Sequence, residues 1–391
     1  MWLCLKYHVN LFFYLWICIV YMKQSSRIFS LDVFRGLTIA LMIIVNSPGT
    51  AFPYPFLDHS PWNGCTLADL VFPFFLFIVG MTSVISLKRY KEEGAELLAN
   101  PYPAIFKRTV VIFLLGLLLN IFPNHFDISQ LRFFGVLQRV AVCYFLSAVI
   151  YLHCSNRMQF FIFCFLLGGY WLLMTQIPVP GFGANQITAE GSWVAYFDQM
   201  VFSSAHLYEK VFDPEGLLST LPSLATTLSG CLTGSLLLST LNLPKKLAYL
   251  VAIGLVFLLL GWLWSYSFPI NKNLWTSSYV LWTSGIALLV FAGCFLMSDI
   301  WAYRAWAMPL KIFGVNALFA YMFHVLLLKT QAKITFPMNG GTMGNFKIGL
   351  TQYLFGGFNP QNAALLYALG FLLLNFLVVY YLYRREIFIK I

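Results

Sequence analysis

Residues 68–87 read ADLVFPFFLFIVGMTSVISL, an almost unbroken apolar run of the length that crosses a bilayer as a helix. The polar loop LDHSPWNGCT precedes it at 57–66, and the basic pair Lys88 and Arg89 follows it. The run is continuous and does not alternate, so it does not fit a strand of a membrane β-barrel. It predicts a membrane-spanning helix.

Nine further runs of the same kind lie on both sides of this segment, at 31–49, 106–122, 133–152, 158–177, 216–239, 247–268, 277–298, 311–329 and 362–383. Each is near the length of about 20 residues that a spanning helix needs. The sequence therefore predicts an all-α, polytopic transmembrane bundle of about ten helices.

The composition of the 391 residues supports this class of protein. Hydrophobic residues make up 60% of the chain and charged residues only 10%, where a soluble domain carries about a quarter. These values exclude a disordered chain and an ordinary soluble enzyme. The eight cysteines are scattered and form no CxxC pair, so we predict neither a disulfide framework nor a metal site.

The basic residues predict the orientation of the bundle. The net charge is +10, but Lys and Arg occupy short loops between apolar runs, which argues against a nucleic-acid partner. With the start of the ten-helix bundle inside, sixteen of them fall in inner segments. Six fall in outer ones: Arg132, Lys210, Lys272, Lys329, Lys333 and Lys347. We therefore expect both ends of the bundle in the cytoplasm.

The first 22 residues have two interpretations. The apolar run 9–22 is short, and it could be an eleventh spanning helix. Alternatively, residues 1–21 are an upstream extension, because Met22 is followed by KQSSRIFSLDVFRG, which resembles a natural start with a basic cytoplasmic tip. On the second interpretation, a chain that begins at Met22 should insert like the full chain.

Polar groups in or beside membrane helices are expensive to bury, so they are candidates for function. Most lie toward the outer half of the predicted bundle, although they come from segments far apart in sequence. One outward-facing polar chamber explains this distribution economically. The candidates are Asn46, His59, Asp69, Arg132, Arg139, Asp213, Glu215, Lys272, Asn273 and His324.

Several of these residues also have a structural interpretation. His59 could be an ordinary loop histidine, and Asp69 could be the acid that favours a helix N-terminus. Arg139 could pair with Asp69 or clamp a backbone carbonyl. The acids on either side of Pro214 could cap the next helix, and His324 could hydrogen-bond across helices.

Two other patterns are predicted to be purely structural. Asp32 and Arg35 lie one turn apart, so they should pair at the inner edge of the first helix. The segment 216–239 is rich in Ser, Thr and Gly, a composition typical of close helix packing in membranes.

The chain contains no GxSxG, Walker, HExxH or helix-opening GxGxxG signature. Six ordered motifs nevertheless resemble the heparan-α-glucosaminide N-acetyltransferase family of transmembrane acyltransferases, over about residues 27–385. They are SLDVFRGLTIALMIIVNSPG, HSPWNGCTLADLVFPFFLFIVG, LRFFGVLQRVAVCYF, FDPEGLLSTLPSLATTLSG, FPINKNLWTSSYV and IFGVNALFAYMFHVLL.

The resemblance implies that 23–391 is one transmembrane acyltransferase domain. It implies a cytoplasmic acetyl-CoA donor and an amino-sugar or glycan acceptor on the far side of the membrane. His59 matches the histidine that the family ties to acetyl transfer, and Asn46 matches the asparagine that accompanies it. For a bacterial member, we expect a multi-pass protein of the inner membrane; a homodimer stays open.

The residue types suit this chemistry. A histidine that titrates near neutrality can take the proton from a glucosamine ammonium, or it can carry the acetyl group covalently. Asn46 could orient His59 or donate to the oxyanion. Asp69, Arg132, Arg139, Asp213, Glu215, Asn273 and His324 are the remaining candidates for substrate binding.

The phosphates of CoA would prefer basic residues at the inner face, namely Lys88, Arg89, Lys107 and Arg108, which equally serve as orientation signals. Two other functions use the same chamber. One is a permease for N-acetylglucosamine or a short glycan, and the other is an O-acyltransferase that acts on a cell-surface polysaccharide. Loss of His59 should abolish turnover of an acetyltransferase, whereas a permease might only change its affinity.

Overall fold

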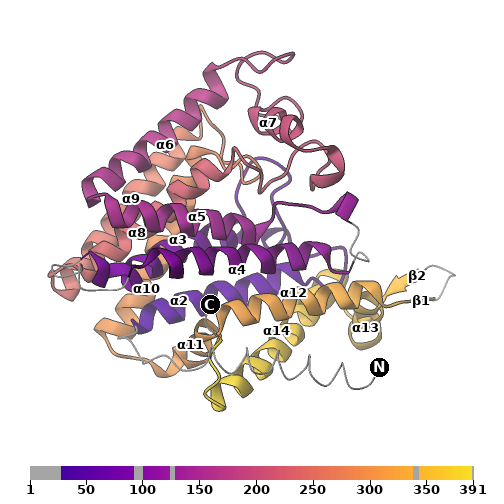
Figure 1. Cartoon of the computed structure of the whole chain (residues 1–391). Helices are drawn as coiled ribbons and strands as arrows, with labels where there is room; N and C mark the ends of the chain where they lie inside the picture. Colours follow the sequence, from indigo (N-terminus) through magenta and orange to yellow (C-terminus); the bar gives the residue numbers. More distant parts are fainter. Residues whose placement is uncertain (1–27, 92–99, 124–127, 338–342, 390–391) are drawn as a thin grey trace, which may run out of the picture.

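A computed structural model describes residues 28–91, 100–123, 128–337 and 343–389; the two interpretations of residues 1–22 concern residues outside these ranges. Figure 1 shows a bundle whose long helices run side by side. Within the described part, nine helices are long and apolar enough to cross a membrane. They are α2 (Phe29–Asn46), α3 (Leu67–Leu87), α4 (Tyr102–Ile121), α5 (Val136–His153), α6 (Asn156–Gln176), α8 (Thr220–Leu238), α9 (Leu243–Trp264), α10 (Ser277–Phe295) and α14 (Pro360–Arg384).

These nine helices confirm nine of the ten predicted segments, and the all-α fold class with them. The tenth prediction, one continuous helix over 311–329, is wrong. The segment forms two helices, α11 (Met308–Val315) and α12 (Ala317–Lys333), with a bend of 72° between them. The bend falls at Asn316, whose buried side chain bonds to the backbone of the chain's last described residues, Ile387 and Ile389.

The centre of the bundle is formed by α3 and α8. The apolar window of each is 72% buried, against 17% for α9. α3 and α8 approach closely because glycines meet backbone there: a Cβ on Gly80 would lie 2.0 Å from the carbonyl oxygen of Thr227. The small residues predicted to pack closely in 216–239 therefore do so, and α4, α6 and α9 leave large apolar side chains exposed for lipid.

The connections between helices gather at two opposite ends, as a bundle of spanning helices requires. At one end, the indole of Trp62 donates to the carbonyl of Ile187 at 2.9 Å, which joins the loop between α2 and α3 to the loop that follows α6. At the other end, Lys91 Nζ donates to the carbonyl of Tyr151 at 2.7 Å. The alternation of loops is as predicted, and which end faces the cytoplasm remains a prediction.

The end that carries Trp62 also carries the remaining short elements. They are α7 (Trp193–Val201), the hairpin β1 (Thr335–Pro337) with β2 (Met343–Asn345), and α13 (Phe346–Phe355). In Figure 1, α7 lies above α4 and α5, and the hairpin lies at the right, past α12. The opposite edge of α2 holds the predicted ion pair, in which Arg35 contacts Asp32 at 2.9 Å. We refer to the end with α7 as the loop end.

Candidate active site

The loop that precedes α3 folds around one buried carboxylate, that of Asp69. Thr66 is the N-cap of α3 and forms a capping box with Asp69 in the first turn. The Oδ2 atom of Asp69 accepts from the backbone N–H of Thr66 at 3.1 Å, from its hydroxyl at 3.2 Å and from the N–H of Ser60 at 3.1 Å. The predicted role of Asp69 as a helix N-terminal acid is therefore real, but it occupies only one of the two carboxylate oxygens.

The second oxygen of Asp69 holds His59. Its Oδ1 atom lies 2.7 Å from Nδ1 of the imidazole. The Asp69 side chain is 1% exposed, whereas that of His59 is 50% exposed. A carboxylate can only accept, so Nδ1 carries the proton and Nε2 keeps its lone pair. A histidine oriented in this way can act as a base or as a nucleophile.

Lys272 completes this cluster from a loop 213 residues away in sequence. Its Nζ atom lies 3.4 Å from Asp69 Oδ1, 3.1 Å from His59 Nδ1 and 3.4 Å from His59 Nε2. The residue of this loop predicted to bind substrate is Asn273, for which no hydrogen bond is found within the described ranges. The sequence includes Lys272 among its polar candidates but not among the predicted substrate-binding residues, although it is one of only six basic residues in the predicted outer segments.

The loop of Lys272 is held rigidly against the loop of His59. The backbone N–H of Gly64 donates to the carbonyl of Ile270 at 2.8 Å, and Asn271 Nδ2 donates to Asn63 Oδ1 at 3.2 Å. Trp275, at φ 52°, turns the chain into α10 in a left-handed conformation that is uncommon for a residue with a side chain. The positions of His59 and Lys272 are thus fixed by backbone and not by the two side chains alone.

Cys65 is the thiol beside this cluster. Burial raises its pKa to about 12, and the negative charge of Asp69 adds to the rise. Because the thiolate is the nucleophilic form, Cys65 is inert near neutral pH. The hydroxyl of Tyr279 on α10 donates to the carbonyl of Asp69 at 2.5 Å, which ties the start of α3 to the centre of the bundle.

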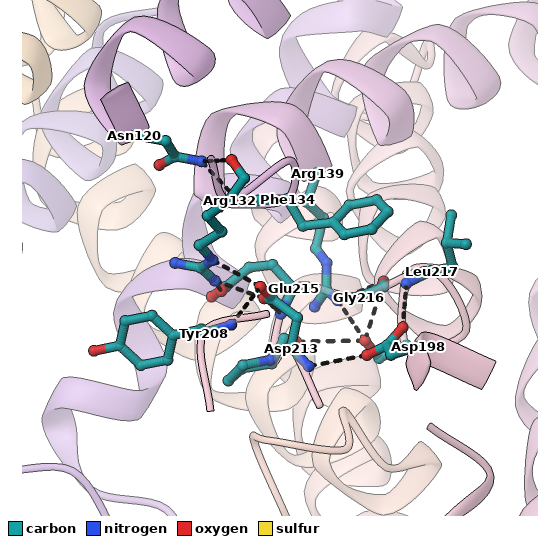
Figure 2. Close-up of polar contacts among 12 residues, drawn as sticks. Asn120, Arg132, Phe134, Arg139, Asp198, Tyr208, Asp213, Glu215, Gly216 and Leu217 are labelled. Atoms are coloured by element: carbon teal, nitrogen blue, oxygen red, sulfur yellow. Dashed lines mark hydrogen bonds and ion pairs between the residues drawn. The ribbon is translucent and has the colours of Figure 1, made fainter. Parts of the chain in front are cut away.

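A second polar cluster surrounds Arg132 at the loop end (Figure 2). Its Nε and Nη2 atoms donate to the two carboxylate oxygens of Asp213 at 2.7 and 2.6 Å, and Nη2 also contacts Glu215. Burial alone would lower the pKa of Arg132, but the bonds to both acids outweigh it and raise that pKa. The sequence interpretation of Asp213 and Glu215 as caps missed this bidentate ion pair, which is typical of arginine.

Asp198 lies behind this ion pair on α7. Its Oδ2 accepts from the N–H of Asp213 at 2.9 Å and its Oδ1 from the N–H of Leu217 at 3.3 Å. Burial raises the pKa of Asp198 to about 6, although the two backbone donors oppose the rise. No predicted candidate included Asp198, because a lone acid in a long loop carries no distinguishing pattern.

Arg139 connects the second cluster to the first. It is 2% exposed and donates from Nη2 to the carbonyl of Gly216 at 3.1 Å and to the hydroxyl of Ser219. Its guanidinium lies 5.1 Å from the ring of Trp275, next to the loop of Lys272. Of the two structural interpretations of Arg139, the carbonyl clamp is the one seen (Figure 2).

Two other predicted residues lie away from the His59 cluster. Asn46 is the last residue of α2 and is exposed, and no hydrogen bond of its side chain is found in the described part of the chain. His324 is fully buried on α12, 5.6 Å from the ring of Tyr321, and within the same residues neither of its ring nitrogens has a hydrogen-bond partner. Roles for both in the reaction remain predictions.

The basic residues predicted to meet CoA flank the junction of α3 and α4 at the opposite end of the bundle. Lys88 and Arg89 follow α3, where Arg89 donates to the hydroxyl of Tyr90 at 2.7 Å. Lys107 is exposed, and Arg108 stacks 4.7 Å over the ring of Tyr144. Nothing in these contacts distinguishes a phosphate site from residues that orient the bundle.

The chain is similar to proteins of known family. The family described as "Heparan-alpha-glucosaminide N-acetyltransferase, catalytic" matches residues 27–265, which include His59 and Asp69 but not Lys272. Heparan-alpha-glucosaminide N-acetyltransferase of Homo sapiens is 28% identical over 93% of this chain and 60% of its own length. The protein of the same name from Mus musculus is 28% identical over 78% of this chain and 54% of its own length.

The chain therefore spans between half and two thirds of the relatives that it matches. The family match covers well over half of the chain, and the nine spanning helices agree with it. Together they show that this chain is a multi-pass membrane protein of the heparan-alpha-glucosaminide N-acetyltransferase family.

Proposed function

We propose that the chain is an acetyl-CoA-dependent N-acetyltransferase. It moves the acetyl group from cytoplasmic acetyl-CoA to the amine of a hexosamine, or of a glycan that ends in one, on the periplasmic side of a bacterial inner membrane. The observation that carries the proposal is the exposed imidazole of His59, held by the buried carboxylate of Asp69 at 2.7 Å. The names of the two relatives agree with this reaction class.

The reaction follows from the tautomer that Asp69 imposes. The neutral amine of the acceptor attacks the carbonyl carbon of the thioester, and Nε2 of His59 accepts one of its protons as the bond forms. The C–N bond forms, the C–S bond breaks, and the proton passes from Nε2 to the sulfur of CoA. Asp69 stays ionised and stabilises the imidazolium while the proton is on the ring.

The alternative route differs in the first partner of Nε2. There, the ring nitrogen attacks the thioester itself, and an acetyl-imidazole carries the group to the amine. Incubation with labelled acetyl-CoA in the absence of acceptor separates the routes. Label that stays on the purified protein, and that leaves it when D-glucosamine is added, identifies the covalent route.

The experiment that tests the proposed function is His59→Ala in the full chain, purified in detergent. We expect turnover of acetyl-CoA and D-glucosamine to fall by about 10²–10⁴-fold, as is usual when a general base is removed. The melting temperature should change little, because the His59 side chain is half exposed. Asn46→Ala should lower turnover by a smaller factor.

The matched control is His206→Ala. His206 is another loop-end histidine, but its Nδ1 atom is hydrogen-bonded to the carbonyl of Leu131 at 2.7 Å, so its role is structural. We expect this variant to keep its turnover. A well-folded His59→Ala protein with normal turnover would contradict the proposed function and favour a permease that uses the same chamber.

A further inference from the structure

Lys272 sits at the same site in a position that a structural ion pair alone does not explain. Asp69 Oδ2 already accepts three hydrogen bonds from Ser60 and Thr66, and Oδ1 accepts from His59. The carboxylate is therefore satisfied without the lysine, whose 3.4 Å contact is the longest of the set. The ammonium instead lies within 3.4 Å of both ring nitrogens of His59.

The charges and protons of the three groups limit what Lys272 can do. One carboxylate balances one positive charge, which Lys272 carries when His59 is a neutral base. Nδ1 of His59 is a donor to Asp69, so it cannot also accept from the ammonium. Lys272 has three N–H donors and Asp69 uses at most one of them, so the others remain available to a group that binds beside the imidazole.

The two side chains that border this space are both accessible. His59 is 50% exposed and Lys272 21% exposed, whereas Asp69 behind them is closed off from solvent at 1%. The backbone bonds between the loops of Gly64 and Ile270 fix the spacing of the two. A base and a cationic donor thus face one common position from preorganised loops, which is the arrangement that stabilises developing charge in acyl transfer.

We propose that Lys272 is a catalytic residue that donates a hydrogen bond to the carbonyl oxygen of the acetyl group during transfer. This role rests on the proposed function. The acceptor nitrogen, hydrogen-bonded to Nε2 of His59, forms its bond to the carbonyl carbon, and the π-electron pair of the carbonyl moves onto the oxygen beside Nζ. The pair returns as the C–S bond breaks, and Lys272 remains protonated throughout.

The spacing of the two groups suits this step. The attacking nitrogen and the oxyanion are bonded to the same carbon in the tetrahedral intermediate. The atoms that hold them, Nε2 of His59 and Nζ of Lys272, are 3.4 Å apart. Lys272 is partly exposed, so an oxyanion can approach its ammonium without displacing the hydrogen bonds that hold Asp69.

The test compares Lys272→Met with wild type, using acetyl-CoA and D-glucosamine and the full chain in detergent. Removal of one oxyanion donor typically lowers kcat by about 10²–10³-fold. We expect a fall of that size, with KM for both substrates within about threefold of wild type. The control is Lys333→Met, an exposed loop-end lysine at the end of α12, which should match wild type.

A second readout separates oxyanion stabilisation from a structural role. Fluoroacetyl-CoA has a more electrophilic carbonyl and depends less on a donor at its oxygen. The deficit of Lys272→Met should therefore shrink at least tenfold with this donor, whereas a misplaced loop would leave it unchanged. An unchanged deficit, or a folded variant whose kcat falls less than tenfold with acetyl-CoA, overturns the role of Lys272.

His59→Ala measured alongside keeps the two proposals distinct. An inactive His59→Ala protein beside an active Lys272→Met protein overturns only the role of the lysine. An active His59→Ala protein overturns the proposed function itself. If Lys272→Met does not fold, Lys272→Leu, which likewise removes the donor, is judged by the same tenfold limit and the same fluoroacetyl-CoA comparison.

Discussion

Asp69→Asn tests how His59 is oriented, because the amide can replace only one of the two carboxylate oxygens. If its NH₂ group takes the place of Oδ2, the backbone donors of Ser60 and Thr66 lose their acceptor. Each unpaired buried donor costs about 1–3 kcal/mol, so this orientation costs about 2–6 kcal/mol. If the NH₂ group takes the place of Oδ1, those bonds remain and only the contacts to His59 and Lys272 change.

The second orientation is therefore the stable one, and it reverses the proton on the ring. An amide N–H beside Nδ1 forces this nitrogen to accept, so the ring proton moves to Nε2, where the lone pair is needed. A histidine held in the wrong tautomer by a neighbouring asparagine costs about 10⁴ in kcat in serine proteases. We expect a loss of about 10³–10⁴ in turnover and only about 1–3 kcal/mol in stability.

The assay is transfer of labelled acetyl from acetyl-CoA to D-glucosamine, with the melting temperature measured on the same preparation. The control is Asp58→Asn in the same loop. Asp58 is exposed, and its Oδ1 accepts from the N–H of His59 at 2.9 Å, a bond that an amide oxygen can keep. A folded Asp69→Asn protein with turnover within tenfold of wild type would refute the argument from the tautomer.

Three further predictions concern stability and orientation. Arg132→Ala leaves two carboxylates without their partner and should destabilise the protein by about 3–5 kcal/mol, seen as a lower melting temperature. Because the folded-state pKa of Asp198 is raised to about 6, the folded protein keeps a proton there that the unfolded chain loses above about pH 4. The contribution of Asp198 to stability thus falls as the pH rises from about 4 to 6 and is absent above about pH 6. Between these pH values, the melting temperature of Asp198→Asn should depend less on pH than that of the wild type. In intact cells, a membrane-impermeant thiol reagent should label Ser60→Cys but not Lys88→Cys in a cysteine-free background, and the reverse pattern would invert the bundle.

The helices were predictable because a bilayer imposes one requirement on every spanning segment, an apolar run of about 20 residues. The bend at Asn316 was not, because the one glycine near it, Gly314, does not by itself predict a break in an otherwise helical apolar run. Its cause is a pair of hydrogen bonds to residues about 70 positions later. A local pattern carries no information about a partner so distant in sequence.

The same limit applies to the candidate site. Sequence placed His59 and Asp69 among the polar residues of the loop end, and both belong to the cluster that the structure describes. Of the two neighbours in the loop that precedes α10, the sequence favoured Asn273 over Lys272 for substrate binding. A lysine in a loop looks the same in sequence whether its side chain faces solvent or an imidazole. Only the pairing of the loops at Gly64 and Ile270 decides which neighbour reaches the ring.

The bend at Asn316 also has a practical consequence for anyone who attaches a reporter to this protein. Its amide group donates to the carbonyl of Ile387 and accepts from the N–H of Ile389, both at 3.0 Å. The segment after α14 is thus hydrogen-bonded to the residue at which α11 and α12 meet. A fluorescent fusion joined at Glu386 would remove both hydrogen bonds of Asn316, whereas one joined after Ile391 through a flexible linker would keep them.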